Sequence, residues 1–347
     1  MPRERFVPEV DLEAAYRNEA IATKVTEAGH GLSSSSQPSI MAIMLERLRL
    51  EPGHRVLEIG AGTGYNAALL QHIVGDKGRV VTVDIDPETA SRARRALKET
   101  RVKVVTGDGR EGYATSAPYD RIVVTASHDE VPRAWLDQLR PEGLLEVPLR
   151  LRGSNSLQLI PTLRREETGF RSVGVVVGGF MPIRSAPDDL TPYWPALNVT
   201  RHEGGESARI LSLYGEAVRS LSPGAARRLL ATALTEPRIR GLRARPSWDS
   251  FGIFFAVAAP AGRLVGAMDE KDFSAGLISR DGRSLALLGG WRPMNCVLVF
   301  GTDAAADELE QLVEDWKERG RPGADDVRMS ISFRDGRSQI RMRWHGR

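Results

Sequence analysis

Residues 56–65 read VLEIGAGTGY, and the rest of the chain is organised around this stretch. The apolar residues Val56, Leu57 and Ile59 predict a buried strand, and the glycines that follow them predict a tight turn. The sequence AALLQHIV after the turn predicts a helix. Glycine has no side chain and tolerates positive φ, so a nucleotide-like ligand can approach this backbone closely. A GxGxG turn alone is a weak signal, and its surroundings decide what it binds.

Strands and helices alternate along the chain after this turn. We expect strands at 79–86, 102–109, 119–127 and 143–149, helices at 87–100 and 131–140, and paired strands within 157–166 and 169–179. Near-continuous apolar strands that alternate with helices are typical of a parallel sheet covered on both faces. The sequence therefore predicts a doubly wound, Rossmann-like α/β fold.

Three acidic residues lie in or at the ends of the first predicted strands. Glu58 lies in the strand that enters the turn, and Asp84 ends the next strand, where a carboxylate can accept both hydroxyls of a ribose. Asp108 ends the third strand, within reach of an adenine amine. Each acid alone could be a turn residue. Together they indicate a cofactor that carries adenosine, because doubly wound sheets bind ligands at the carboxyl ends of their strands.

The turn itself distinguishes between NAD and S-adenosyl-L-methionine, which both carry adenosine. The dinucleotide pattern GxGxxG is not met, because the third glycine is Gly64 and position 65 is a tyrosine. A methionine moiety needs room for an ammonium and a carboxylate rather than for a pyrophosphate. The turn therefore favours the methyl donor.

Six stretches between Phe6 and Arg184 resemble the protein-L-isoaspartate O-methyltransferase family: SSQPS (35–39), VLEIGAGTGYNAALL (56–70), VTVDID (81–86), GDGREGY (107–113), APYDRIVVTAS (117–127) and FMPIR (180–184). The resemblance implies a seven-stranded fold that uses S-adenosyl-L-methionine. It also implies methylation of the carboxyl group of isoaspartyl residues, whose ester then closes to a succinimide.

The resemblance also implies a set of site residues. The expected cofactor-binding residues are Glu58, Gly60, Gly62, Tyr65, Asp84, Ile85, Asp108 and Gly109. Ser36 matches the serine of the family's T-I-S-x-P loop, so Ser36, with Ser35 beside it, is expected at the acceptor carboxylate as the catalytic pair. The serine run 33–36 could also be a flexible linker, but its position just ahead of the glycine turn favours an active-site loop.

The chain departs from the family in its acceptor loop and its length. Ser34 and Ser35 stand where the family has threonine and isoleucine, the family's N-terminal helices are largely missing, and residues 185–347 have no counterpart in the short repair enzyme. These departures resemble variants that modify ribosomally synthesised peptides (RiPP biosynthesis). In those variants the ester of a chosen aspartate closes to an aspartimide. We therefore expect methylation of an aspartate in such a peptide, with repair of isoaspartyl residues in damaged proteins as the alternative.

The expected reaction makes few chemical demands. A carboxylate with a pKa near 4 is ionised at neutral pH, so no strong base is needed, and serine hydroxyls can orient it by hydrogen bonding. His128, in the loop after residues 119–127, could line the acceptor site, although an exposed loop position is favoured. No group of His, Cys and acidic residues has the spacing of metal ligands, so we expect no metal.

Composition bounds the class of protein. The single cysteine, Cys296, excludes an intrachain disulfide, no apolar segment of a signal peptide opens the chain, and the run 251–261 is too short to span a membrane. We expect a cytoplasmic protein without a membrane partner. There are 25 basic and 26 acidic residues before Leu190, and 23 and 19 from there on. The second half therefore has four more basic than acidic residues. This excess is smaller than the clustered positive charge expected of a nucleic-acid-binding protein, which favours a peptide partner.

Two further classes stay open at this point. A nucleic-acid methyltransferase would be expected to carry an N/D-P-P-Y clamp after the fourth strand, where this chain reads TASHDEVP. A nucleotide-binding module without catalysis is the other alternative.

The length of 347 residues suggests two domains. We expect a methyltransferase domain at 1–187, a proline-rich linker at 188–202 and an α+β domain at 203–347, which could recognise the peptide, supply a dimer contact or stabilise the first domain. In this second half we expect two helices within 207–235, strands at 251–260, 263–268, 284–290 and 296–301, a helix at 303–320, and a final hairpin within 327–344.

Two local expectations concern the ends of the chain. Residues 8–25 read as an amphipathic helix with Leu12, Tyr16 and Ile21 on one face, followed by a helix that Ser39 caps. In the final hairpin, Arg341 and Arg343 face away from the apolar stripe, which suits an acidic peptide or an added strand. A solvated edge strand that the arginines protect is an equally good interpretation.

Overall fold

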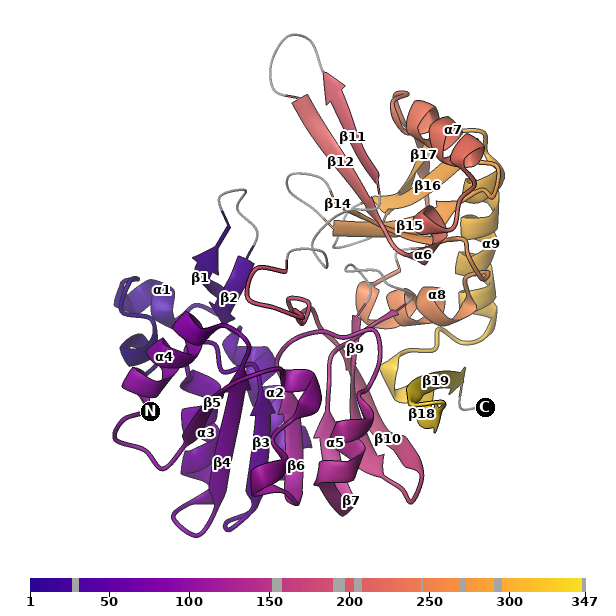
Figure 1. Ribbon diagram of the computed structural model, residues 1–347. Coiled ribbons are helices and arrows are strands. Elements are labelled where there is room, and N and C mark those ends of the chain that lie inside the picture. Colours follow the sequence, from indigo (N-terminus) through magenta and orange to yellow (C-terminus); the bar gives the residue numbers. More distant parts are fainter. Residues whose placement is uncertain are drawn as a thin grey trace.

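The computed structural model of the chain describes residues 1–26, 31–151, 158–189, 197–202, 208–244, 246–268, 273–289 and 295–344 (Figure 1). The described residues form two large β-sheets with helices packed against them, and a small hairpin near the N-terminus. None of the helices in these residues is long and apolar enough to cross a membrane.

The first sheet begins with the strand of the glycine stretch and is parallel at its centre. Its parallel strands lie in the order β5-β4-β3-β6-β7. The elements of this part are β3 (Arg55–Ile59), α3 (Tyr65–Val74), β4 (Arg79–Asp84), α4 (Pro87–Ala96), β5 (Lys103–Thr106), β6 (Tyr119–Val124), α5 (Arg133–Gln138) and β7 (Leu139–Glu146). The strand that enters the glycine turn therefore lies in the middle of a buried parallel sheet, as the sequence predicted.

Antiparallel strands extend this sheet beyond β7. β9 (Gln158–Arg165) pairs with β7, β10 (Gly169–Val177) pairs with β9, and the short β8 (Leu149–Arg150) also pairs with β9. These strands complete the seven-stranded order β5-β4-β3-β6-β7-β9-β10 of a Rossmann-like methyltransferase fold. The predicted fold class is confirmed.

The last hairpin of the chain returns to this first sheet. β18 (Val327–Arg334) and β19 (Arg337–Trp344) pair with each other, and β18 pairs with β10 through Gly169, Phe170 and Arg171. A hydrogen bond of 2.8 Å from the Met329 amide to the Ser172 hydroxyl reinforces this junction. The sequence predicts this hairpin, but as part of the second domain. Its pairing with β10 joins segments far apart in the chain, and no local sequence pattern predicts that contact.

The second sheet is antiparallel and contains seven strands in the order β11-β12-β14-β15-β16-β17-β13. Their bounds are β11 (Leu197–His202), β12 (Ala208–Tyr214), β13 (Arg238–Gly241), β14 (Leu264–Met268), β15 (Phe273–Ile278), β16 (Ser284–Gly289) and β17 (Cys296–Gly301). The helices of this part are α6 (Glu216–Arg219), α7 (Pro223–Ala233), a π-helical segment at Trp248–Gly252, α8 (Ile253–Ala258) and α9 (Ala304–Glu318). An α+β second half agrees with the sequence-based expectation.

Two predictions in the second half are wrong in detail. Residues 251–258, expected as a strand, form the end of the π-helical segment and α8, and Ala208–Tyr214, expected as helix, form β12. A short apolar run such as FGIFFAVA does not distinguish a buried helix from a buried strand, because every residue of either is covered. The expected linker 188–202 contains β11, and its residues 190–196 lie outside the described residues.

The N-terminal prediction of one amphipathic helix is also wrong. The segment forms a 3-10 turn (Arg3–Phe6), the short α1 (Leu12–Tyr16) and the strand β1 (Ile21–Val25), which pairs with β2 (Gly31–Ser35). Leu12 and Tyr16 are exposed rather than buried. The helix that follows is α2 (Pro38–Arg47), and its N-cap residue is Gln37 instead of Ser39.

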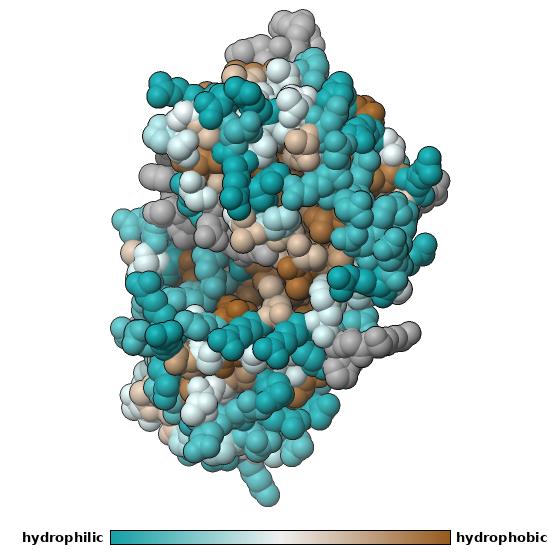
Figure 2. All heavy atoms as spheres, turned by 90° about the vertical axis from the view of Figure 1, so that its right-hand side faces the viewer, coloured by the Kyte–Doolittle hydropathy of each residue, from teal (hydrophilic) through white to brown (hydrophobic). Residues whose placement is uncertain are grey.

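A continuous apolar core joins the two halves of the chain. It contains Trp135 and Leu145 from the first sheet and its helices, Phe251 and Trp316 from the second half, and Met329 from the last hairpin. Figure 2 shows the side of the molecule that carries α9 and this hairpin, where apolar side chains are visible in a hollow between two mostly hydrophilic lobes. The division into domains at 188–202 stays a prediction, and it separates residues that pack in one core.

Candidate functional site

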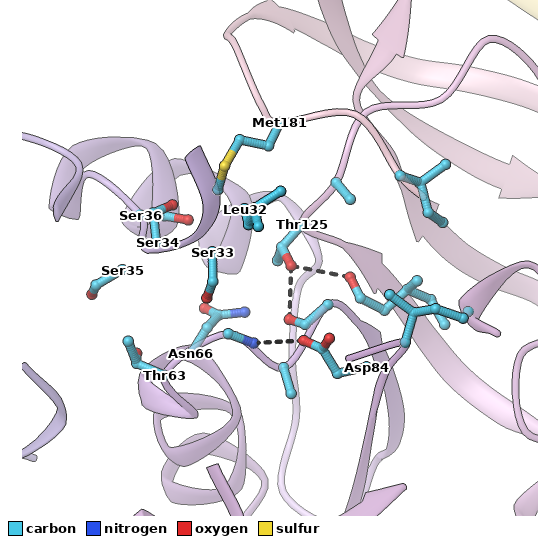
Figure 3. A pocket seen from close by; sticks show the side chains of 18 of the residues that line it. Leu32, Ser33, Ser34, Ser35, Ser36, Thr63, Asn66, Asp84, Thr125 and Met181 are labelled. Atoms are coloured by element: carbon cyan, nitrogen blue, oxygen red, sulfur yellow. Dashed lines mark hydrogen bonds between the residues drawn. The ribbon is translucent and has the colours of Figure 1, made fainter. Parts of the chain in front are cut away.

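A pocket lies at the carboxyl ends of β3, β4 and β6, on the glycine turn (Figure 3). Eight of the ten predicted site residues line it: Ser35, Ser36, Gly60, Gly62, Tyr65, Asp84, Ile85 and Gly109. They come from the end of β2, the glycine turn, the first residue of α3, the end of β4 and the turn after β5, so the fold gathers residues that are widely separated along the chain. Glu58 and Asp108 do not line the pocket.

The backbone of the glycine turn has the geometry that its sequence predicts. Gly60, Gly62 and Gly64 have φ values of 100°, 50° and 86°, in the region that favours glycine. A Cβ atom on Gly60 would lie 2.4 Å from the Thr125 hydroxyl, and one on Gly62 would lie 3.0 Å from the Ser34 carbonyl oxygen. The turn is therefore a bare backbone surface that a side chain would obstruct.

Asp84 accepts a hydrogen bond from the glycine turn and lines the pocket. One carboxylate oxygen accepts the Gly62 amide at 3.1 Å, and the other accepts the Asp86 amide at 3.0 Å. Burial raises the pKa of the Asp84 carboxyl, against the opposing effect of these two hydrogen bonds. Asp84 thus lies at the end of β4 and beside the turn, and its contact with a ribose stays a prediction.

Glu58 is fully buried beneath the pocket. Its carboxylate accepts hydrogen bonds from the Thr82 hydroxyl at 2.5 Å and from the Asn66 amide at 2.8 Å. Burial raises the pKa of Glu58 to about 7, although both hydrogen bonds lower it. Asn66 itself lines the pocket, so Glu58 acts on the site by holding the Asn66 amide in one orientation.

Asp108 is also set back from the pocket. It caps the short 3-10 turn Gly109–Glu111 and forms an ion pair of 2.5 Å with Arg110. Although burial favours the neutral acid, the hydrogen bonds and the charge of Arg110 lower the pKa of Asp108. In this structure its neighbour Gly109 forms the pocket wall, and the Asp108 carboxylate is engaged by Arg110.

The serine run forms a strand wall of the pocket rather than an irregular loop. Ser33, Ser34, Ser35 and Ser36 all line it, and Figure 3 shows the Ser33 side chain pointing toward Asn66. The side chain of Ser35 is almost completely buried and lies 3.4 Å from the Arg3 guanidinium, which donates to it. Of the predicted pair, Ser36 is therefore the better candidate for a contact with the acceptor.

Arg3 fixes the end of this strand through hydrogen bonds and does not line the pocket. Its guanidinium is buried and donates to the carbonyl oxygens of Ser36 at 2.8 Å and of Ala15 at 2.7 Å. No sequence motif predicts this role of Arg3, because a single arginine near the start of a chain belongs to no recognisable pattern.

Other pocket residues were also not predicted. They include Leu32, Met41, Thr63, Asn66, Thr125, Met181 and Arg184, besides the serines already named. Arg184 is buried and donates to the carbonyl oxygens of Leu32, at 3.5 Å, and of Pro187. A signal existed for Asn66, which directly follows the glycine turn, and for Met181 and Arg184, which lie in the FMPIR stretch.

His128 is a buried residue, so the favoured exposed position is wrong. Its ring lies edge-on to Trp135, with the centroids 6.1 Å apart, and its Nδ1 accepts the Glu130 amide at 3.0 Å. Burial lowers the pKa of His128 to about 4, so the ring is neutral at physiological pH. It does not line the pocket. Among the described residues, no group of three His, Cys, Asp or Glu side chains could hold a metal ion.

Comparison with known proteins adds to this geometry. The family model "Protein-L-isoaspartate(D-aspartate) O-methyltransferase" matches residues 1–184. The chain is similar to Protein-L-isoaspartate O-methyltransferase 2 of Archaeoglobus fulgidus, with 40% identity over 49% of this chain and 74% of the relative. It is also similar to Protein-L-isoaspartate O-methyltransferase of Methanopyrus kandleri, with 45% identity over 46% of this chain and 70% of the relative.

A solved structure titled protein-L-isoaspartate O-methyltransferase is similar over nearly the whole length. The match covers 98% of this chain and 92% of the other, with a TM-score of 0.53 and 24% identity. At this identity the likeness concerns the fold alone. It includes the second half of the chain, which the family model does not reach.

Proposed function

This chain belongs to the protein-L-isoaspartate O-methyltransferase family and uses S-adenosyl-L-methionine, and from that premise we propose that it methylates the free α-carboxylate of an isoaspartyl residue in a peptide. The observation that carries the proposal is the shared pocket. Ser36 and the glycine turn with Asp84 line one cavity, so an acceptor at the serines would lie beside a methyl donor on the turn.

The pocket residues suit this cofactor. Asp84 offers a carboxylate to ribose hydroxyls. The glycine turn leaves open space next to its backbone, and a Cβ atom at Gly60 or Gly62 would occupy that space. Tyr65 packs against Phe6, with ring centroids 5.3 Å apart, and closes one side of the pocket. When bound, S-adenosyl-L-methionine supplies a methyl group on a positively charged sulfur. The residues of this chain then bind the cofactor and the peptide, orient the acceptor carboxylate and exclude water from the pocket.

The serines of β2 have the chemistry to orient a carboxylate. A hydroxyl can donate to a carboxylate oxygen without the repulsion that an acidic side chain would add. Arg3 holds the carbonyl group of Ser36, so the strand end is fixed before substrate arrives. A carboxylate oxygen oriented in this way would take the methyl group from the sulfonium of the cofactor, which would leave as a neutral thioether without any proton transfer. The resulting ester is attacked by a backbone amide nitrogen of the peptide, which releases methanol and closes the succinimide.

The nature of the acceptor rests on the relatives and on the serine strand. The names of the relatives favour isoaspartate. The added second half no longer favours a peptide-modifying variant, because a solved structure titled as the isoaspartate enzyme has a similar fold over 98% of this chain. The remaining argument for the variant is Ser34 and Ser35, which stand where the family has threonine and isoleucine. Aspartate in a ribosomally made peptide, closing to aspartimide, is therefore the second candidate.

The deciding experiment offers the enzyme two matched peptides that differ only in one residue, isoaspartate or aspartate. Mass spectrometry follows a gain of a methyl group and then loss of methanol. Faster turnover of the isoaspartyl peptide is the expected result. Turnover of a cyclised, ribosomally made peptide with aspartate, and none of the isoaspartyl peptide, would favour the second candidate instead.

A parallel measurement with Ser36→Ala tests the site itself. The variant should bind S-adenosyl-L-methionine as tightly as the unchanged protein in calorimetry, while its methyl transfer to peptide falls. If transfer stays at background in the unchanged protein with every peptide, the non-catalytic binding module is the better description. Methyl transfer to an oligonucleotide would instead identify a nucleic-acid methyltransferase.

A further inference from the structure

The outward face of the C-terminal hairpin is rich in arginine. Residues alternate between the two faces of β18 and β19, and on the inward face Val327, Met329 and Ile331 are buried while the inward residues of β19 are half-buried. On the outward face five arginines are exposed: Arg328, Arg334, Arg337, Arg341 and Arg343. The hairpin therefore presents a strongly positive surface on a strand pair that is firmly anchored from behind.

The register brings these arginines together in pairs. Arg328 lies opposite Arg343, and Arg334 lies opposite Arg337. Like charges directly opposite each other on one face destabilise a strand pair. Two such pairs in an eight-residue ladder are unfavourable for the hairpin by itself, and they become favourable when an anion lies across them.

The acids nearby leave this charge largely uncompensated. Arg334 approaches only Asp335, at 3.9 Å, and both side chains are highly exposed. Arg328 donates to the carbonyl oxygens of Asp325 and Val327. In the part of the chain that the structure describes, Arg337, Arg341 and Arg343 have no carboxylate within ion-pair distance. Solvent screening makes each exposed ion pair weak, so these arginines contribute substantially only to the binding of a partner that contacts several of them at once.

The neighbouring strands continue the same face. Arg171 of β10 lies opposite Ser330, and Arg164 of β9 lies opposite Arg171. These two arginines are paired with Glu166 and Glu142. The free positive charge is therefore concentrated on the last two strands, at the edge of the sheet, where β19 has only one neighbour.

We propose that the outward face of β18 and β19 is a docking surface for an extended acidic segment of the peptide substrate, which lies along the edge strand β19. Naming the substrate as the carrier rests on the proposed function. An extended chain can pair with the backbone of an edge strand while its carboxylates meet the arginines at every second position. Guanidinium groups suit carboxylates because the two planar groups can form paired hydrogen bonds.

A single-stranded nucleic acid fits this surface less well. Such ligands are held by aromatic side chains on which bases stack, together with positive charge. The outward residues of β18 and β19 are arginine, serine and glutamine, and the aromatic residues Phe333 and Trp344 belong to the inward set. The surface thus offers charge and an edge without a stacking platform.

A competing interpretation is that the arginines only protect the edge strand from pairing with another copy. This interpretation and the docking surface predict different results when the charge is removed. Protection predicts that neutral variants dimerise or aggregate, with no effect on acidic peptides. Docking predicts weaker binding of acidic peptides by a protein that keeps its oligomeric state.

The test compares Arg337→Gln/Arg341→Gln/Arg343→Gln with Arg227→Gln/Arg243→Gln/Arg319→Gln, which removes three exposed arginines elsewhere. Fluorescence anisotropy measures the dissociation constant of a labelled oligoglutamate peptide, with an oligouridylate of equal length as the second probe. We expect the hairpin variant to bind oligoglutamate about tenfold more weakly, and the control variant to bind it as the unchanged protein does.

Kinetics add a second readout. For a substrate peptide with an acidic tail, the hairpin variant should show a higher KM and an unchanged kcat, while a peptide without the tail should be unaffected. Equal binding by both variants, tighter binding of the oligouridylate, or dimerisation with unchanged peptide binding would each overturn the proposal. Because anisotropy needs no methyl transfer, failure here is distinct from failure of the proposed function.

Discussion

The buried carboxyl of Glu58 makes the stability of the folded protein depend on pH. Its pKa is about 7 in the folded protein against the usual 4.5, with burial as the main cause. The folded protein therefore holds a proton in this interval that the unfolded chain releases. The stability from this group is fully present below about pH 4.5, and roughly 3 kcal/mol of it is lost as the pH rises through about 7.

We therefore expect Glu58→Gln to reduce the fall in thermal stability between about pH 5 and pH 8, because glutamine does not ionise. Scanning calorimetry at several pH values measures this. Glu318→Gln, at an exposed acid of α9, is the control and should keep the unchanged profile. Burial raises the pKa of Glu146 to about 8. This residue is unchanged in all three proteins, so its contribution to the pH dependence of stability is the same in each. Identical profiles for Glu58→Gln and the unchanged protein would contradict the burial cost.

Asp84 gives a second prediction, which concerns cofactor binding. Asp84→Asn keeps the shape but removes the negative charge that accepts the Gly62 amide and, in our proposal, the ribose hydroxyls. Hydrogen bonds to charged groups are worth about 1.5–3 kcal/mol, so affinity for S-adenosyl-L-methionine should fall roughly tenfold to a hundredfold. Titration calorimetry measures the change, and Asp137→Asn, at an exposed acid of α5, should leave affinity unaltered. Unaltered affinity in Asp84→Asn would remove Asp84 from the cofactor site.

At the scale of elements, the strand β2 depends on Arg3 for its position. Arg3→Met fills the same space but cannot donate to the carbonyl oxygen of Ser36 or to that of Ala15. We expect kcat/KM for the peptide to fall at least about tenfold, since the acceptor wall loosens, while cofactor affinity changes little. Steady-state kinetics and calorimetry separate the two effects.

Arg5→Met is the matched control, because Arg5 is exposed and pairs only with Glu99 at the surface. Surface pairs of this kind contribute about 0–1 kcal/mol, so the control should behave as the unchanged protein. If Arg3→Met weakens cofactor binding as much as it lowers kcat/KM, the role of Arg3 is general stability of the N-terminal region and not placement of β2.

At the scale of the whole molecule, the shared core makes the two halves dependent on each other. Ile331 of β18 lies opposite Phe170 of β10 and is almost completely buried. Ile331→Ala should cost about 2–5 kcal/mol and lower the midpoint of a single unfolding transition that includes both halves. Calorimetry tests this, with Ile239→Ala, at an exposed position of β13, as the control. Two separate transitions, with one of them unmoved, would instead support independent domains.

Local patterns predicted much of the fold and of the cofactor site. The strands around Val56, Asp84 and Ile122 follow from apolar runs between turn signals, and the turn at Gly60–Gly64 follows from glycine itself. Their carboxyl ends meet because parallel strands with helical crossovers must align in that way. The position of Asp84 beside the turn could therefore be predicted, because the two lie at the ends of consecutive parallel strands.

The same reasoning failed where contacts between distant segments decide the outcome. Residues 251–258 are helical, but residues 251–256 are all buried, so no hydrophobic period in the sequence distinguishes helix from strand. Ser35, which lines the pocket, is also a buried hydrogen-bond partner of Arg3, which lies more than thirty residues earlier in the chain, and no local pattern predicted that contact.

The sequence by itself determined the glycine turn and the strand ends that carry Asp84 and Gly109, because local apolar runs and glycines specify each of them. Only the tertiary structure decided that the last hairpin joins the first sheet, that its arginines stand opposite one another at the free edge, and that β2 is held by Arg3. These features depend on strand pairing and side-chain hydrogen bonds across long loops. The loop-closure entropy of such contacts is offset by the whole core, and no short stretch of sequence records it.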